Sequence, residues 1–284
     1  VCSSDLSSKL AKTPCFFADQ ACQEKAKRGE PLMPGFAFKS LGFGRFSPIL
    51  GLRNEANTAF LPFRTTTGGQ RLLITYDAGR PYELDPESLQ LVTPVGTNAQ
   101  WRAETPFPCV FPPMLSTAHP VADSATEEVF MINYGRSVAN ILGWLRRSML
   151  AKGLPKWLES ITASLANIEH HADLRLRSSR WLARLIEQIL KWLPRNNSDF
   201  TRLIRWNGSG ELEVWTVTVA GQPVVIQQTV HQMGLSKDHI IFADTAFQFG
   251  LEQAIMNPVP EAPGLDRLLQ KLLLKPQEIG RAHV

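Results

Sequence analysis

The sequence of 284 residues is poor in cysteine and contains no long uninterrupted apolar run. Its four cysteines form no C-x-x-C pair and no spacing typical of a zinc site or a disulfide framework, which favours a reducing compartment. Residues 138–150 form the most apolar stretch, but Arg146 and Arg147 interrupt it, and a membrane-spanning helix needs roughly 20 residues. Since 44% of the residues are apolar and 20% charged, we expect a globular, cytoplasmic protein.

Several motifs of common enzyme classes are also missing. The sequence contains no G-x-x-x-x-G-K-[ST], no G-x-G-x-x-G, no H-E-x-x-H and no G-x-S-x-G. These absences remove the simplest interpretations as a nucleotide-binding protein, a zinc protease or a serine hydrolase. Histidine is the residue type that remains for chemistry.

The two ends do not resemble natural protein sequence. Residues 1–6, Val-Cys-Ser-Ser-Asp-Leu, and residues 278–284, Glu-Ile-Gly-Arg-Ala-His-Val, correspond to translations of the two strands of one sequencing adapter. We therefore exclude both ends from the fold and expect residues 7–277 to be an internal fragment of a longer protein.

Two regions have the texture of antiparallel β-structure, with short β-branched and aromatic runs between turn clusters. We assign residues 7–135 and 202–277 to these regions. The strands expected in them are 71–76, 89–92, 127–134, 204–206, 211–219, 224–230 and 239–243. The fold class predicted from this texture is mainly β.

The segment between the two β regions, residues 136–201, is predicted to be a basic helical insertion. Residues 136–205 contain 13 Lys and Arg against 5 Asp and Glu, and apolar residues recur at helical spacing from Leu182 to Leu193. The segment either packs on the β body with a solvated basic face or docks on a membrane surface, because Trp and Leu beside basic residues are typical of interfacial helices. It contains no recognisable nucleic-acid motif, so we expect no nucleic-acid partner. The candidate docking residues are Trp144, Leu145, Arg146, Arg147, Trp181 and Arg184.

Two of the histidines have similar surroundings. His119 precedes the expected strand 127–134, and His231 precedes the expected strand 239–243, so each lies where a β run meets a turn. Imidazole suits several transition metals, and ligands from different strands converge at such positions in propellers and barrels. Taken singly, each is also typical of a hydrogen-bonded structural histidine. We interpret His239 as structural and the pair His170 and His171 as solvated.

Several motifs, in their order, resemble the carotenoid cleavage oxygenases. They are Asn-Thr-Ala at 57–59, the box from Tyr76 to Leu89 containing Pro-Tyr-Glu-Leu-Asp-Pro, Thr-Ala-His-Pro-Val-Ala-Asp at 117–123, and Val-Phe-Met-Ile-Asn-Tyr at 129–134. Residues 230–247 resemble the second histidine motif of that family, in which a strand and Asp-x-x-Phe follow the histidine. The resemblance covers about residues 31–135 and 201–249.

This resemblance implies a partial seven-bladed β-propeller with an α-helical insertion, and an Fe(II) held on the propeller axis by four histidines. His119 matches the first ligand and His231 the second. Asp77 stands where the family commonly has a glutamate that accepts an imidazole N–H, and it is one methylene shorter. The implied partners are an apolar polyene and O₂, with peripheral membrane contact through the insertion. The sequence does not indicate the oligomeric state.

The implied activity is that of a bacterial-type dioxygenase that cleaves a conjugated C=C bond of a carotenoid or apocarotenoid. The isomerohydrolase branch of the family shares the metal site. The rival hypothesis is an iron-free propeller that serves as a lipid-binding or scaffold module. Since the third and fourth histidines have no counterpart before residue 277, we expect the fragment alone to bind iron substoichiometrically and to be inactive.

Overall fold

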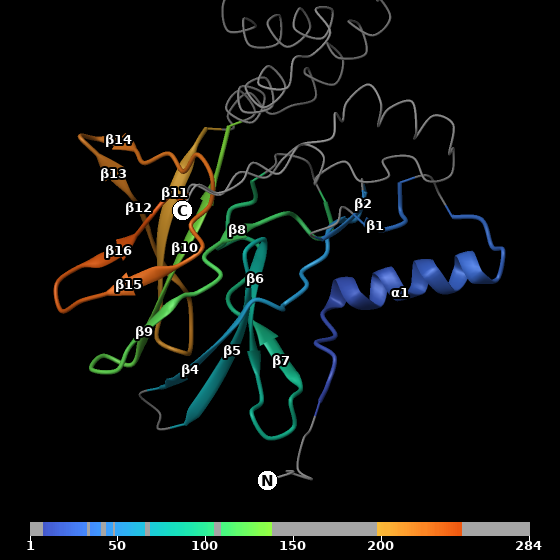
Figure 1. Cartoon of the computed structure of the whole chain (residues 1–284), viewed down its shortest axis with the longest axis horizontal. Helices are drawn as coiled ribbons and strands as arrows, with labels where there is room; N and C mark the ends of the chain where they lie inside the picture. The colour runs from blue at the N-terminus through green and yellow to red at the C-terminus, as the bar shows by residue number, and fades with distance from the viewer. Residues whose placement is uncertain are drawn as a thin grey trace, which may run out of the picture. The chain divides into compact units, whose positions relative to one another are not determined.

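The structure is a computed structural model of the whole chain, and it describes residues 8–32, 35–40, 44–47, 49–65, 69–104, 109–137 and 198–245. The chain divides into two compact units. The first consists of Val1–Lys39, Phe46–Val138 and Leu193–Phe247, and the second of Ser40–Arg45, Ala139–Trp192 and Gln248–Val284. Nearly all described residues belong to the first unit, which is mainly β (Figure 1).

Most of the predicted insertion, including every candidate docking residue from Trp144 to Arg184, lies outside the described residues, as do both predicted adapter ends. Among the residues that the structure describes, no helix is long and apolar enough to cross a membrane. The docking hypothesis therefore stays a prediction.

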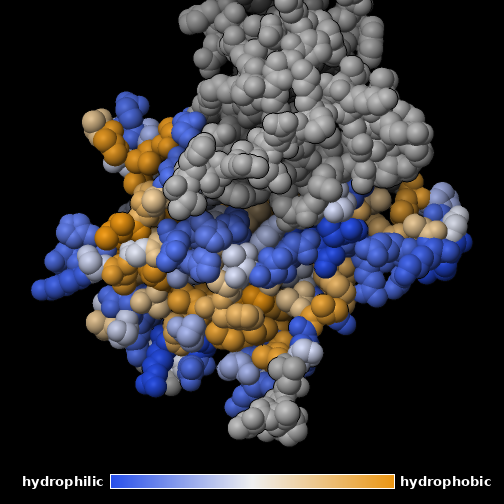
Figure 2. All heavy atoms as spheres, in the orientation of Figure 1, coloured by the Kyte–Doolittle hydropathy of each residue, from blue (hydrophilic) through white to orange (hydrophobic). Residues whose placement is uncertain are grey.

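One helix, α1 (Pro14–Lys27), precedes the strands, and the sequence analysis did not predict it. Proline at its first position suits a helix start, because the amide that proline lacks would have no intrahelical partner there. Lys25 and Lys27 lie in the last turn, where positive charge interacts favourably with the negative end of the helix dipole. The helix is anchored by Cys15, which packs with Phe38 and Leu50. Figure 2 shows mainly hydrophilic residues on the visible face of α1.

The first large sheet is an antiparallel meander of four strands in the order β4-β5-β6-β7. Its strands are β4 (Ala59–Arg64), β5 (Gln70–Tyr76), β6 (Gly79–Leu84) and β7 (Leu91–Pro94). Pro62 lies in β4, an edge strand, where a missing amide donor is tolerated. The expected strands at 71–76 and 89–92 correspond to β5 and β7.

The second large sheet has the order β12-β11-β10-β8, and β9 also pairs with β10. Its strands are β8 (Leu115–Ser116), β9 (Val121–Asp123), β10 (Glu128–Gly135), β11 (Phe200–Trp206) and β12 (Glu213–Thr216). In the antiparallel pair β10 and β11, Gly135 lies opposite Phe200. The chain between these two residues therefore connects neighbouring strands, and β11 begins two residues before the boundary expected at 202.

The remaining strands are short. They are β1 (Lys39–Ser40), β2 (Arg45–Ser47), β3 (Gly51–Leu52), β13 (Thr218–Val219), β14 (Gln222–Pro223), β15 (Met233–Leu235) and β16 (Ile240–Phe242). The predicted strand at 224–230 is wrong, because this segment is irregular. Its apolar residues Ile226 and Val230 are buried, but several of its backbone groups bind side chains rather than a neighbouring strand. His239, expected within a strand, lies in the turn before β16.

The core lies on both faces of β10. Val129 and Met131 belong to a cluster shared with Leu73 of the first sheet, whereas Ile132 and Tyr134 belong to a cluster with Val230. Successive residues of a strand point to opposite faces, so a strand that is buried on both sides needs a nearly continuous apolar run. The sequence Val-Phe-Met-Ile-Asn-Tyr in β10 is a run of this kind. The second cluster contains Val230, so it packs against the segment that carries His231.

Candidate metal centre

The imidazoles of His119 and His231 lie side by side. Their ring centroids are 4.8 Å apart and the rings meet edge to face at 67°. Two backbone hydrogen bonds fix this approach: the His119 amide donates to the His231 carbonyl at 2.9 Å, and the Met233 amide donates to the His119 carbonyl at 3.3 Å. The two residues that the resemblance pairs as ligands thus lie in contact, although 112 positions separate them.

Asp77 contacts the second of these rings. Its Oδ1 lies 2.9 Å from Nδ1 of His231, and the side chains of Asp77 and His231 are 35% and 46% exposed. A neutral His231 that donates its Nδ1–H to this carboxylate keeps the lone pair on Nε2. Metal-binding histidines are oriented by contacts of this type. Asp77, one methylene shorter than a glutamate, therefore reaches the ring.

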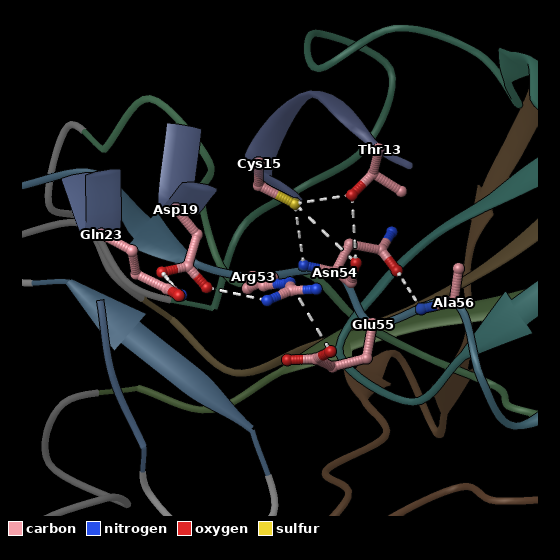
Figure 3. Close-up of polar contacts among 8 residues, drawn as sticks. All are labelled: Thr13, Cys15, Asp19, Gln23, Arg53, Asn54, Glu55 and Ala56. Carbon is pink, nitrogen blue, oxygen red and sulfur yellow. Dashed lines mark hydrogen bonds and ion pairs between the residues drawn. The ribbon is translucent and has the colours of Figure 1, made fainter. Parts of the chain in front are cut away.

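Asp77 is positioned by the strand that leads to His119. It follows β5 in the turn before β6, and its carbonyl accepts the amide of Ser116 at 2.8 Å. The buried Ser116 hydroxyl lies 2.9 Å from the carbonyl of Tyr76 and 2.8 Å from that of Gly79. A side chain at Gly79 would overlap Asn54, since an added Cβ would lie 2.3 Å from Asn54 Nδ2. A larger residue here would displace the Asn54 side chain, whose Nδ2 donates to the Arg80 carbonyl at 2.8 Å and whose Oδ1 accepts the Ala56 amide at 3.1 Å (Figure 3).

His119 follows a segment that is completely buried. Ser116, Thr117 and Ala118 have no exposed surface. The Thr117 amide donates to the Ile132 carbonyl and the Ile132 amide donates to the Thr117 hydroxyl, both at 3.0 Å. The Thr75 hydroxyl also donates to the Ala118 carbonyl. Strands β5 and β10 together fix the backbone on which His119 stands.

Two buried tyrosines limit the anionic donors near this site. Burial, followed by the negative charges of Glu55 and Asp77, raises the pKa of Tyr76 to about 12. Burial also raises the pKa of Tyr134. Both phenols are protonated at neutral pH, so the negative charge beside His231 comes from Asp77.

The donor set fits part of a metal site. In the described ranges, no group of three or more His, Cys, Asp and Glu residues is placed to hold a metal ion. Two neighbouring imidazoles, one of them oriented by a carboxylate, nevertheless suit two positions on a transition metal such as Fe(II). His239 is exposed in a turn and bonds Ser236, so it takes no part, and His170 and His171 lie outside the described residues.

The sequence analysis missed residues that support the site without touching a ligand ring. Ser116 holds the turn of Asp77, and Asp244 binds the segment before His231. Asp244 is the aspartate of the Asp-x-x-Phe motif, so the sequence marked its position. The resemblance gave no role to this aspartate. No comparable signal marks Ser116, because a serine before a turn is common.

A family model described as RPE65, retinal pigment epithelial membrane protein, matches residues 16–158, half of the chain. The match includes all but the first two residues of α1, as well as Asp77 and His119. It extends past residue 135, where the first stretch of the resemblance ended, whereas His231 lies outside it. No curated protein matches the chain significantly.

The solved structures that match include two variants of the apocarotenoid oxygenase (ACO) of Synechocystis. One has 16% identity, a TM-score of 0.33 and coverage of 79% of this chain and 32% of that chain. The other has 15% identity, a TM-score of 0.35 and coverage of 82% and 33%. A chimera of ACO and RPE65 has 16% identity, a TM-score of 0.32 and coverage of 79% and 32%. This chain thus spans about one third of the length of these structures. Because the family model matches half of the sequence, the chain belongs to the carotenoid oxygenase family.

Proposed function

We propose that the chain is an internal part of a non-haem Fe(II) dioxygenase that cleaves a conjugated C=C bond of a carotenoid or apocarotenoid with O₂. The observation that carries the proposal is the contact of His119, His231 and Asp77 within a chain of this family. Three residues distant in sequence converge with the chemistry that a metal site needs. A structural histidine pair would not require the carboxylate on one ring.

His119 and His231 would hold the iron, and the bound iron would supply the site at which O₂ reacts. A site with four imidazoles needs two more histidines, which we place in the parent protein beyond this chain. Two antiparallel sheets, the four-stranded β4 to β7 and the five-stranded β8 to β12, support the proposal that the parent is a seven-bladed propeller, since propeller blades are small antiparallel sheets, typically of four strands.

The residues of this chain have three roles in the proposed reaction. Asp77 accepts the Nδ1–H of His231, which fixes the orientation of the ring. Tyr76 and Tyr134 stay protonated and add no charge. Val230 and Met233, which precede and follow His231 in the chain, are buried in an apolar cluster. Apolar surroundings of this kind suit a polyene substrate. In the overall reaction one C=C bond and the O–O bond break, and each new carbonyl product receives one oxygen atom.

The insertion is proposed as the contact with the lipid phase. A carotenoid dissolves in bilayers, and basic residues near Trp and Leu favour an anionic membrane surface. Sedimentation with anionic liposomes, with and without residues 138–197, tests this role. Equal binding by both proteins would leave the segment without a docking function.

The decisive experiment uses the full-length parent protein. We expect the purified protein to contain iron, to consume O₂ and to bleach an apocarotenoid, with two carbonyl products by mass spectrometry. His119→Ala and His231→Ala should each lose iron and activity, whereas His239→Ala, in an exposed turn, should retain both. An isomerised product without O₂ uptake would identify an isomerohydrolase, and a folded protein that never binds iron would favour the lipid-binding or scaffold module.

A further inference from the structure

The segment before His231 has no regular strand, yet it is held at defined points. Its first amides, those of Gln227 and Gln228, both donate to Asp244, at 2.7 Å to Oδ2 and 2.9 Å to Oδ1. Each carboxylate oxygen therefore accepts one backbone amide. Hydrogen bonds to a charged acceptor are stronger than those between neutral groups.

The neighbouring residues repeat this connection. The Thr229 and Thr245 hydroxyls lie 2.7 Å apart, and the Thr245 amide donates to the Thr229 carbonyl at 2.9 Å. On the other side, Arg136 donates to the Gln227 carbonyl at 3.2 Å and is paired with Glu104 at 2.8 Å. The start of the segment is thus bound from two directions, and Asp244 accepts the amides of both Gln227 and Gln228.

The end of the segment carries the histidine. Val230 is fully buried between Thr229 and His231, and the backbone of His231 is bonded to that of His119. A short segment that is fixed at residues 227–229 and buried at 230 leaves its last residue little freedom. The position of the His231 ring against Asp77 therefore depends on where the start of the segment is held.

We propose that Asp244 is a positioning residue for His231: it binds the two amides that set the path of the segment and so keeps the imidazole on Asp77 and beside His119. It contacts neither ring itself. The inference rests on the proposed function only in treating His231 as a ligand. The effect on the path of the chain is independent of any metal.

Asp244→Asn is the sharpest variant, because it preserves shape. One carboxylate oxygen becomes an NH₂ group, which cannot accept and which faces a backbone donor, so one of the two hydrogen bonds is lost. Asp238→Asn is the matched control. Asp238 is an exposed residue of the turn between β15 and β16, and the same chemical change there leaves the segment untouched.

The experiment measures amide hydrogen exchange, residue by residue, in the metal-free parent protein. The informative amides are those of His119 and Met233, which close the contact between the two histidine segments and do not touch Asp244. In Asp244→Asn we expect their exchange to accelerate on the order of tenfold, which corresponds to about 1.4 kcal/mol of local stability. Asp238→Asn should leave them unchanged.

A purely local role gives a different pattern. If only the amides of Gln227 and Gln228 exchange faster in Asp244→Asn, the inference is overturned, whatever happens to the melting temperature. Loss of iron(II) to a chromophoric chelator is measured separately and should be about tenfold faster in Asp244→Asn than in Asp238→Asn. A parent protein that holds no iron would refute the proposed function, while the exchange pattern would still decide the role of Asp244.

Discussion

His119 and His231 reach the same place from two differently built stretches of chain. The residues before His119 are fully buried and bonded to strands β5 and β10, whereas the residues before His231 are irregular, partly exposed and bound by side chains. Amides that are bonded within buried strands exchange their hydrogens with water slowly, whereas exposed contacts to side chains open more easily. We therefore expect the bonds that hold the segment before His119 to open less often than the side-chain contacts that hold the segment before His231.

The largest expected effect concerns the turn that carries Asp77. Gly79→Ala would place a methyl group 2.3 Å from Asn54 Nδ2, so the Asn54 side chain must shift and its hydrogen bonds to the Arg80 carbonyl and the Ala56 amide are weakened. Overpacking of this kind costs about 1–3 kcal/mol, which chemical denaturation measures. Gly69→Ala is the control, since no atom lies within 4 Å of the added group. Equal stability of the two variants would mean that the turn is not fixed by Asn54.

Asp77→Asn tests the contact that orients the His231 ring. The amide cannot accept the Nδ1–H of His231 as a charged partner, so we expect the iron affinity of the parent protein to fall about 10- to 100-fold. Since both side chains are substantially exposed, the melting temperature should change little. Unchanged iron affinity together with unchanged activity would show that Asp77 only shapes its turn.

Ser116→Ala and Thr229→Val compare the two segments directly. Ser116 is buried and its hydroxyl serves carbonyls of the Asp77 turn, so its removal should cost about 1–3 kcal/mol. Thr229 is only partly buried, and its replacement should cost about 0.5–1.5 kcal/mol, the net value of one ordinary hydrogen bond. Urea unfolding of both variants gives the ranking. A greater loss of stability for Thr229→Val would mean that the contacts before His231 open less easily than those before His119.

The smallest effect at neutral pH concerns Tyr76. Its folded-state pKa is raised to about 12, above the ordinary value near 10, so the folded state keeps a proton that the unfolded state loses. The contribution to stability is complete below about pH 10 and is lost as the pH rises through 12. Tyr76→Phe should flatten the stability curve between these two pH values. An identical alkaline decline in the variant would assign the effect to another group.

The strand-rich texture could be predicted because alternating apolar residues and turn clusters are local signals. Strand β10 is an example: its apolar run and the polar turn before it define both its position and its burial. Helix α1 was missed since it buries little of its surface, so its sequence has no clear apolar stripe. The error at 224–230 arose because burial of Ile226 and Val230 resembles a strand, while the partners of the backbone are distant side chains that no local pattern shows.

The site was predictable only through resemblance. The sequence spacing of His119 and His231, 112 positions apart, does not predict that they are in contact. The order of motifs shared with a known family does predict it. The contact of Asp77 with His231 followed from the same source. The supports of the site, Ser116 and Asp244, depend on three-dimensional partners and could not be inferred from single residues.

The pairing of Gly135 with Phe200 has a consequence for engineering. Opposite residues of antiparallel strands have Cα atoms about 4.5–5.5 Å apart, a gap that a two-residue hairpin turn can close. The register of β10 and β11 therefore sets no minimum length for the chain between these positions beyond that of a hairpin turn. A protein in which a short turn replaces this stretch could keep the same residues of the two strands opposite each other.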